Sequence, residues 1–468
     1  MLFNTLQFAV FFLAILGLYR SLPAPARNAL LLAASLLFYV LWIPAYLPLI
    51  LIDIGVNYAL LRGMRRSPRP GLLLGLSVGF TLALLAYFKY AAMIVTSALP
   101  LLEGGLGLDV SIPEILLPLG ISFYSFQIIA FSVDSYRHPE RELPRLGRYA
   151  LFVCFFPQLI AGPILRGNEF LPQLENRGQM NAERTRRGLW LIASGIAKKV
   201  VMADFLLAPY VDAVFSAPGV ASAPFHLVAM YCFTFQIYFD FSGYTDMGRG
   251  MALLLGYELP MNFTEPFLSR NPSEVWRRWH ITLSRWMQDY LYIPLGGNRH
   301  SEARTYVNLL ITMLLSGLWH GAGWNFVLWG GFHGVLLAAH RRFGRRRQDI
   351  HEAITWRDAG RIAVHFHFFA FAFIAFRSES LADMARFVKA LFGGGELSGW
   401  PVMQAGIVLL CAALHLAERK LRLGLPRLQG ACAHRTGGLA LEGLALGALL
   451  AVAVMVAGAG GEFIYFQF

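Results

Sequence analysis

The chain has 468 residues, of which 56% are hydrophobic and only 15% are charged, whereas an ordinary soluble domain is about a quarter charged. Its mean hydropathy is +0.52, and apolar stretches recur from residue 5 to residue 458 without a long hydrophilic block between them. This composition excludes a soluble globular protein and predicts an all-α integral membrane protein with a single domain over residues 1–468.

The formal net charge of +12 raises the question of a nucleic-acid partner. The Lys and Arg residues lie in short segments between apolar stretches, such as residues 62–69 and 341–347, which is the pattern of cytoplasmic loops in membrane proteins. We therefore expect this protein to have the lipid bilayer as its partner, and we expect no nucleic-acid partner. The four cysteines have no metal-ligand spacing, so we expect no metal and no tightly bound cofactor.

About eleven stretches are long and apolar enough to cross a bilayer as helices. In chain order they are residues 5–19, 28–43, 46–62, 71–88, 112–133, 225–240, 305–320, 325–341, 359–376, 401–417 and 438–458. The first lacks a basic region ahead of it, so we interpret it as a retained span and not as a signal peptide. Residues 149–164 and 188–206 contain prolines or charged residues, and we expect re-entrant or interfacial helices there.

The distribution of basic residues orients these spans. Segments rich in Lys and Arg should face the cytoplasm, and they are residues 20–27, 62–69, 137–148, 262–304, 341–347 and 418–435. The intervening loops 103–109 and 378–399 carry few basic residues and should face outward. Both termini are then expected on the external side of the membrane.

Residues 262–304 are too polar to cross a bilayer but are rich in Trp, Tyr and Arg. We expect them to lie along the cytoplasmic interface as helices, with the aromatic rings at headgroup level. Ser273 is a candidate cap for a helix that starts near Glu274, and the segment from Pro294 to Gly297 should end the next helix.

His320 is the clearest candidate for chemistry. It lies at the turn between spans 305–320 and 325–341, which should form a hairpin with glycines that permit close helix approach. An imidazole near neutrality can accept a proton from a hydroxyl and return it to a leaving group. Spacing alone leaves two interpretations open, a general base or a structural histidine that bonds to a neighbouring span.

Four other histidines are less distinctive from residue type alone. His280 follows Trp276-Arg-Arg-Trp, where it either assists His320 or belongs to an aromatic belt at headgroup level. His333 is expected to serve packing. His365 and His367 flank a Phe-rich span and are expected at the interface.

Charged residues in apolar surroundings form a second set of candidates. Asp240 and Asp246 are either proton relays or cation ligands, or they pair with Arg249 or Arg277 and hold the fold. In the same way, Lys198 and Lys199 either form ion pairs near Asp204 or bind the phosphate of a donor. We expect the structural role for the two aspartates.

Several motifs together resemble the membrane-bound O-acyltransferase family, and most of all its bacterial branch that includes the alginate O-acetyltransferase membrane component. The motifs are Trp276-Arg-Arg-Trp-His-Ile-Thr-Leu-Ser-Arg-Trp-Met-Gln-Asp-Tyr-Leu-Tyr-Ile-Pro-Leu-Gly-Gly-Asn-Arg299, Ser316-Gly-Leu-Trp-His-Gly321, Leu117-Pro-Leu-Gly-Ile-Ser-Phe-Tyr124, Pro157-Gln-Leu-Ile-Ala-Gly-Pro163 and Tyr238-Phe-Asp-Phe-Ser-Gly-Tyr-Thr-Asp246. They cover most of residues 110–340, which we interpret as the core of the domain.

The resemblance implies that this bundle of about 11 expected transmembrane helices is hollowed into a central funnel or tunnel. The acyl donor would enter the tunnel from the cytoplasm and the acceptor would approach from the other side. His320 matches the catalytic histidine of the family's tunnel, and His280 falls at its second polar position. The same motifs supply further candidates for substrate or donor binding, which are Trp319, Arg277, Asp240 and Asn298.

The C-terminal tail, residues 459–468, contains Glu462-Phe-Ile-Tyr-Phe-Gln-Phe468, which resembles a tail motif of the same branch. By resemblance, Tyr465 would be a phenolic acyl carrier and a third catalytic residue. The alternative is an aromatic anchor at the external interface, where Tyr and Phe are ordinary residues.

The resemblance leads us to expect a bacterial inner-membrane enzyme with periplasmic termini. It would move an acetyl group from acetyl-CoA, or an acyl group from a carrier, to an exported polysaccharide such as alginate or cellulose, with a periplasmic SGNH-type acetyltransferase subunit as partner. The alternatives are D-alanyl or lipid acyl transfer by the same chemistry, and a proton-coupled transporter.

Overall fold

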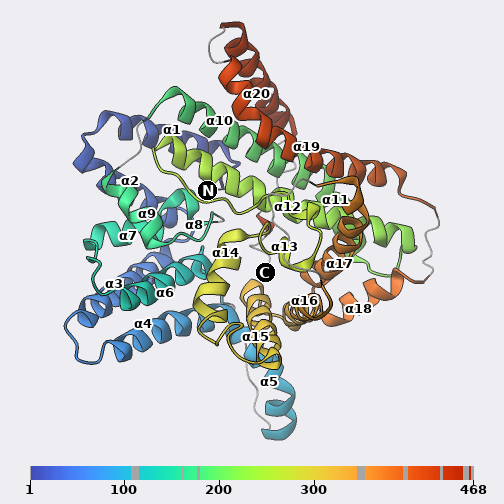
Figure 1. Cartoon of the computed structure of the whole chain (residues 1–468), viewed down its shortest axis with the longest axis horizontal. Coiled ribbons are helices and arrows are strands. Elements are labelled where there is room, and N and C mark those ends of the chain that lie inside the picture. Colours follow the sequence, from blue (N-terminus) through green and yellow to red (C-terminus); the bar gives the residue numbers. More distant parts are fainter. Residues whose placement is uncertain are drawn as a thin grey trace. The chain divides into compact units, whose positions relative to one another are not determined.

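The computed structural model describes residues 2–106, 115–160, 162–176, 180–344, 354–393, 399–432, 436–456 and 463–464. Every element of regular structure in these ranges is a helix (Figure 1). The chain divides into two compact units, Met1–Gly188 with Gly248–Pro260, and Leu189–Met247 with Met261–Phe468. The helices α10 (Ala182–Ile196) and α12 (Ala223–Leu254) each pass from one unit to the other.

The first unit is built from apolar helices. They are α1 (Leu6–Ser21), α2 (Ala24–Val40), η1 (Pro44–Tyr46), α3 (Leu47–Met64), α4 (Pro70–Leu85), η2 (Ala86–Tyr90), α5 (Ala91–Leu106), α6 (Ile121–Arg137), α7 (Leu146–Cys154), α8 (Phe156–Leu159) and α9 (Gly167–Glu175). Helix α3 packs against α4, α6 and α7, and α2 packs against α7. The core of this unit therefore lies among five helices.

The second unit carries the histidines that the sequence singles out. Its helices are η3 (Ala197–Leu207), α11 (Ala208–Ser216), η4 (Pro266–Leu268), α13 (Pro272–Val275), α14 (Ile281–Met287), η5 (Gln288–Tyr292), α15 (Glu302–His320), α16 (Trp324–Phe343), η6 (Trp356–Asp358), α17 (Ala359–Arg377), α18 (Leu381–Ala390), α19 (Val402–Cys432) and α20 (Thr436–Val456), together with most of α12. Helices α15 and α16 lie side by side, and α16 also packs against α13 and α17 (Figure 1).

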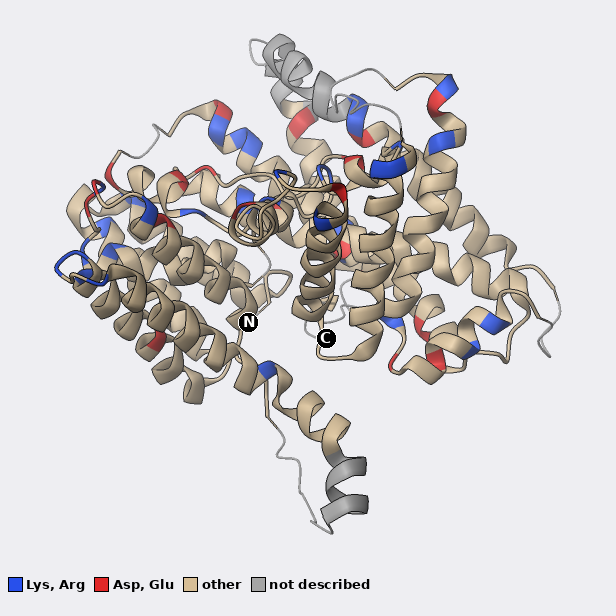
Figure 2. Cartoon of the chain, turned by 60° about the horizontal axis from the view of Figure 1, so that its bottom comes forward, with Lys and Arg blue, Asp and Glu red and all other residues tan. Residues whose placement is uncertain are grey.

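Four helices in the described residues are long and apolar enough to cross a membrane: Pro44–Met64, Pro70–Ala98, Trp356–Arg377 and Val402–Lys420. The charged residues lie mainly in loops and at helix ends, so most of the helical surface is uncharged (Figure 2). Large apolar side chains are exposed on these surfaces, as on α1, where Leu6 is 79% and Leu13 is 65% exposed. Such surfaces suit contact with lipid.

The structure departs from regular α-helix in both stretches, 149–164 and 188–206, where re-entrant or interfacial helices were expected. The first is interrupted at Phe155, between α7 and α8 and two residues before Pro157, whose ring and missing N–H disfavour a continuous helix. The second continues α10 as the π-helical turns of η3, which include Lys198 and Lys199. Single π-turns are often found at functional sites.

Several predicted boundaries were wrong. Helix α12 continues well past Asp240, and α5 extends through part of the loop that was expected at residues 103–109. The outward segment 378–399 contains α18, which begins after the N-cap Ser380. The cap of α13 is Asn271 and not Ser273, because the Asn271 side chain accepts the Glu274 N–H at 2.9 Å.

Candidate functional site

Helices α15 and α16 form the predicted hairpin, and His320 is the last residue of α15. The two helices approach closely because a glycine on each helix faces the backbone of the other. A Cβ atom at Gly317 would lie 2.1 Å from the carbonyl oxygen of Phe326, and one at Gly330 would lie 2.2 Å from that of Met313. The expected role of glycine in helix approach is confirmed, and the position of His320 depends on it.

His320 is only 3% exposed and is surrounded by aromatic rings. Its ring centroid lies 5.0 Å from that of Trp319, 5.1 Å from that of Trp329 and 5.1 Å from that of Phe376, all with T-shaped geometry. Phe376 comes from α17, and its role could not be read from the sequence because it is a member of a Phe-rich stripe. The rings fix the orientation of the imidazole inside an apolar environment.

His280 is completely buried and has a left-handed backbone, with φ 42°. This conformation costs a residue with a side chain about 1–2 kcal/mol. The two residues that follow it are held by Asn262, because the Ile281 N–H donates to the Asn262 carbonyl at 2.9 Å and the Thr282 hydroxyl donates to the Asn262 side chain at 2.6 Å. Such strain is typical of functional positions, and the sequence carried no signal for it.

Burial lowers the pKa of His280 to about 3, so its ring is neutral at physiological pH. A neutral imidazole has one nitrogen that donates and one that accepts a hydrogen bond. His280 can therefore donate or accept a hydrogen bond and orient a polar group without contributing a permanent charge to the site.

The structure brings His280 and His320 together with Trp319. The two imidazole centroids are 6.3 Å apart, and the Trp319 ring packs against His320 at 5.0 Å and against His280 at 6.0 Å. These residues come from α15 and from the N-terminus of α14. Two buried imidazoles at this separation are suited to acid–base chemistry on one bound group.

Next to this pair lie buried ion pairs. Lys199 pairs with Asp204 at 2.9 Å and also with Asp240, and all three side chains are at most 6% exposed. Lys198 pairs with Asp246 at 2.9 Å and also with Glu418. Of the two interpretations left open for the lysines, the structure shows the ion pairs, and the structural role expected for Asp240 and Asp246 is met by these lysines.

Asp240 also connects these charges to the end of the chain. Its carboxylate accepts the backbone N–H of Ile464 at 2.9 Å. The preceding Phe463 is buried, with its ring 4.5 Å from that of Tyr244 and 5.8 Å from that of Phe241. Phe241 in turn packs on His280 at 4.8 Å. The described part of the tail, Phe463 and Ile464, is therefore anchored beside Phe241, whose ring contacts His280. Tyr465 lies outside the described residues.

The remaining candidates lie elsewhere in the second unit. Arg277 is half-buried, and its Nε donates to the Ser273 carbonyl at 3.4 Å. Asn298 is exposed in the turn that follows η5. His333 is buried and packs against Trp329 at 4.7 Å, as expected of a packing residue. Roles for Arg277 and Asn298 in binding remain predictions.

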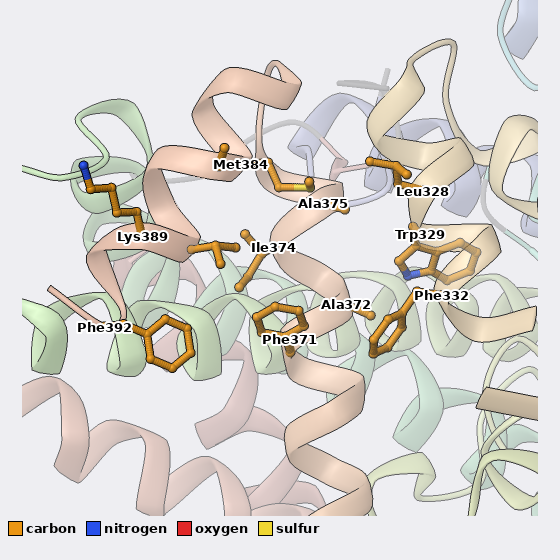
Figure 3. Close-up of a pocket in the computed structure, with 12 residues that line it drawn as sticks. Leu328, Trp329, Phe332, Phe371, Ala372, Ile374, Ala375, Met384, Lys389 and Phe392 are labelled. Atoms are coloured by element: carbon orange, nitrogen blue, oxygen red, sulfur yellow. The ribbon is translucent and has the colours of Figure 1, made fainter. Parts of the chain in front are cut away.

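An apolar cavity of about 650 Å³ lies beside the same hairpin. Leu328, Trp329 and Phe332 of α16 line one side of it, and Lys389 and Phe392 lie at the other end (Figure 3). Trp329 therefore separates this cavity from His320, which packs against the same indole. The cavity is lined by residues of three helices, so no single sequence motif indicates it.

Removing the Lys199 charge should destabilise the second unit. Lys199→Met leaves Asp204 and Asp240 buried without the cation that they share, and breaking such a pair costs about 3–5 kcal/mol. We expect a clear drop in the thermal unfolding midpoint in detergent. Lys389→Met, at an exposed lysine, is the matched control. Equal midpoints for the two variants would show that the buried ion pairs contribute nothing to stability.

Comparison with known proteins gives a consistent result. The model of the MBOAT, membrane-bound O-acyltransferase family, matches residues 76–377. A probable alginate O-acetylase AlgI of Pseudomonas putida is 40% identical over 404 residues, which are 85% of this chain and 81% of the relative. A peptidoglycan O-acetyltransferase of Helicobacter pylori is 35% identical over 435 residues, 84% of this chain and 80% of the relative.

A less similar relative is named for the transfer of a D-alanyl group and not of an acetyl group. The teichoic acid D-alanyltransferase of Streptococcus thermophilus is 30% identical over 250 residues, which are 50% of this chain and 59% of the relative. The resemblance that the motifs indicated is therefore confirmed.

Proposed function

Because the chain belongs to the membrane-bound O-acyltransferase family and is a multi-pass membrane O-acyltransferase, we propose that it acetylates an exported polysaccharide. It takes the acetyl group from acetyl-CoA at the cytoplasmic side of a bacterial inner membrane, and both of its termini face the periplasm. The names of the alginate and peptidoglycan relatives support a polysaccharide acceptor. The observation that carries the proposal is the buried His280–His320 pair beside the anchored tail.

In this proposal His320 is the general base. It takes the proton of the accepting hydroxyl while that oxygen attacks the thioester carbonyl, and the C–S bond then breaks as the tetrahedral intermediate collapses. The thiolate of CoA leaves and receives the proton from the imidazolium. His280 assists by orienting the reacting groups, and dipoles of the site stabilise the oxyanion. Trp319, Arg277, Asp240 and Asn298 contribute to binding of the donor or acceptor.

The first acceptor is the phenolic hydroxyl of Tyr465. The anchor between Ile464 and Asp240 supports this assignment, because it fixes the residue that precedes Tyr465 close to the ring that packs on His280. An aryl ester is reactive enough to pass the acetyl group onward. A separate periplasmic SGNH-type subunit would then transfer it to the polymer, for which alginate and cellulose are the candidates.

The test uses the purified full-length protein in lipid nanodiscs with radiolabelled acetyl-CoA. We expect release of CoA and a covalent label on the wild-type chain, and no label on Tyr465→Phe. Tyr87→Phe, at an exposed tyrosine of the first unit, is the matched control and should be labelled normally.

Other outcomes distinguish the alternatives. Label on Tyr465→Phe at the wild-type level would remove the tyrosine from the pathway but leave the transfer intact. Labelling by a D-alanyl carrier protein, and not by acetyl-CoA, would instead assign the chemistry named for the streptococcal relative. A chain that neither hydrolyses any acyl thioester nor becomes labelled would fit a proton-coupled transporter and overturn the proposal.

A further inference from the structure

A second polar site lies in the first unit, far in the sequence from the histidines. Asp53 sits within α3, one of the helices apolar enough to cross a membrane, and its side chain is 0% exposed. A carboxylate in this setting is costly and marks a functional site by default. Among the described residues, no Lys, Arg or His forms an ion pair with it.

One carboxylate oxygen of Asp53 accepts two side-chain hydrogen bonds. Its Oδ1 accepts a hydrogen bond from Asn57 Nδ2 at 2.7 Å and another from the Thr81 hydroxyl at 3.1 Å. Ser77 continues the network, because its hydroxyl donates to the Asn57 side-chain oxygen and also bonds to Ser132 at 2.9 Å. All of these side chains are fully buried. Helices α3, α4 and α6 are thus joined by one chain of polar contacts.

The other oxygen of Asp53 is not satisfied. Its Oδ2 is buried and has no hydrogen-bond partner within the described part of the chain. The side chains of Tyr39, Tyr124 and Tyr149 interact electrostatically with Asp53 from α2, α6 and α7. The Tyr149 hydroxyl also has no hydrogen-bond partner among the described residues. Buried polar atoms without a protein partner indicate a bound water or ion.

Protonation of Asp53 alone does not give its Oδ2 a hydrogen-bond partner. A proton on Oδ2 would remove the charge but would itself need an acceptor, and Oδ2 has no hydrogen-bond partner among the described residues. A cation resolves it, because it neutralises the carboxylate and is coordinated by the oxygens around it. The available ligands are carboxylate and hydroxyl oxygens, which hard cations prefer. One carboxylate balances one positive charge, which favours a monovalent ion.

We propose that the Asp53 carboxylate and the surrounding Thr and Tyr hydroxyl oxygens bind one sodium ion inside the first unit. The ion connects α3 to the helices that supply the other oxygens, so its binding stabilises the folded unit by mass action. This inference does not depend on the acyl-transfer proposal, since no residue of the histidine site takes part.

The test measures the thermal unfolding midpoint of the purified full-length protein in detergent. Sodium chloride is titrated against choline chloride at constant ionic strength, and sodium-22 binding is measured in parallel. We expect a saturable rise of several degrees with sodium and one bound ion per chain. Asp53→Asn should lose both effects, and Thr81→Val, which keeps the carboxylate, should need more sodium for the same shift.

Asp212→Asn is the control, because Asp212 is 59% exposed and lies in the second unit; it should keep the full sodium response. The wild-type protein alone can overturn the proposal, even if Asp53→Asn fails to fold. Equal midpoints in sodium and choline would do so, as would a midpoint that depends on pH and not on sodium, which would identify Asp53 as a neutral acid. A sodium response that persists in Asp53→Asn would place the ion elsewhere.

Discussion

Replacing His320 with alanine is expected to abolish acyl transfer while the protein still inserts into the membrane. The proposed base is lost, and the contribution of a positioned general base is about 10²–10⁴-fold in rate. The rings of Trp319, Trp329 and Phe376 at about 5 Å carry no basic nitrogen. Burial lowers the pKa of His280, 6.3 Å away, to about 3, so His280 is too weak a base to replace His320. The measurement is the rate of CoA release from acetyl-CoA and of covalent labelling.

Two further variants separate chemistry from packing. His320→Phe keeps an aromatic ring among its aromatic neighbours, so it should be as inactive as the alanine variant but closer to wild type in unfolding midpoint. His367→Ala changes an exposed histidine of α17 and should leave the rate unchanged. Wild-type rates in His320→Ala, or wild-type rates in His320→Phe, would exclude His320 as the base.

The second large effect is expected at Gly330 of α16. In Gly330→Ala the new Cβ would lie 2.2 Å from the Met313 carbonyl oxygen and 3.0 Å from the Leu314 Cα. These are backbone atoms that cannot rotate away, so α15 and α16 must separate. Overpacking of this kind costs about 1–3 kcal/mol or more. Because His320 ends α15, we also expect most of the acyl-transfer rate to be lost.

Gly331 provides an unusually close control for this change. It is the next residue of the same helix, yet its Cβ would meet only the Leu314 Cδ2 at 3.6 Å, which is ordinary van der Waals contact. Gly331→Ala should therefore keep both the unfolding midpoint and the rate, and alanine there even favours the helix. Equal behaviour of the two variants would show that the close approach at Gly330 does not support the site.

The sequence was informative where a single segment contains the whole feature. The hairpin at His320 follows from two apolar stretches separated by a glycine-containing turn, and the structure ends α15 at His320. The family motifs also drew attention to His280, which lies beside His320. Local patterns of this kind need no knowledge of tertiary contacts.

The sequence was uninformative where distant segments meet. The hydrogen bond between Ile464 and Asp240 joins residues 224 positions apart, and the Lys199–Asp240 pair follows from the packing of η3 against α12. The full length of α12 was missed for the same reason. The expected span 225–240 ended at Asp240, but Asp240 and Asp246 lie within α12, where Lys199 and Lys198 pair with them. Asp53 was overlooked because a single acid in an otherwise apolar stretch barely changes its hydropathy.

The anchor of the tail is made by the main chain of Ile464 and not by its side chain. Asp240 therefore holds a main-chain N–H that every residue except proline supplies, while the buried side chain of Ile464 packs in the core of the second unit. Apolar substitutions other than proline should keep the anchor, whereas an insertion or deletion just after it would shift the phenol of Tyr465 by about 3.3–3.6 Å per residue of extended chain. If Tyr465 accepts the acyl group as proposed, the number of residues between the Asp240 anchor and the phenol should therefore matter more for activity than the identity of the anchored residue.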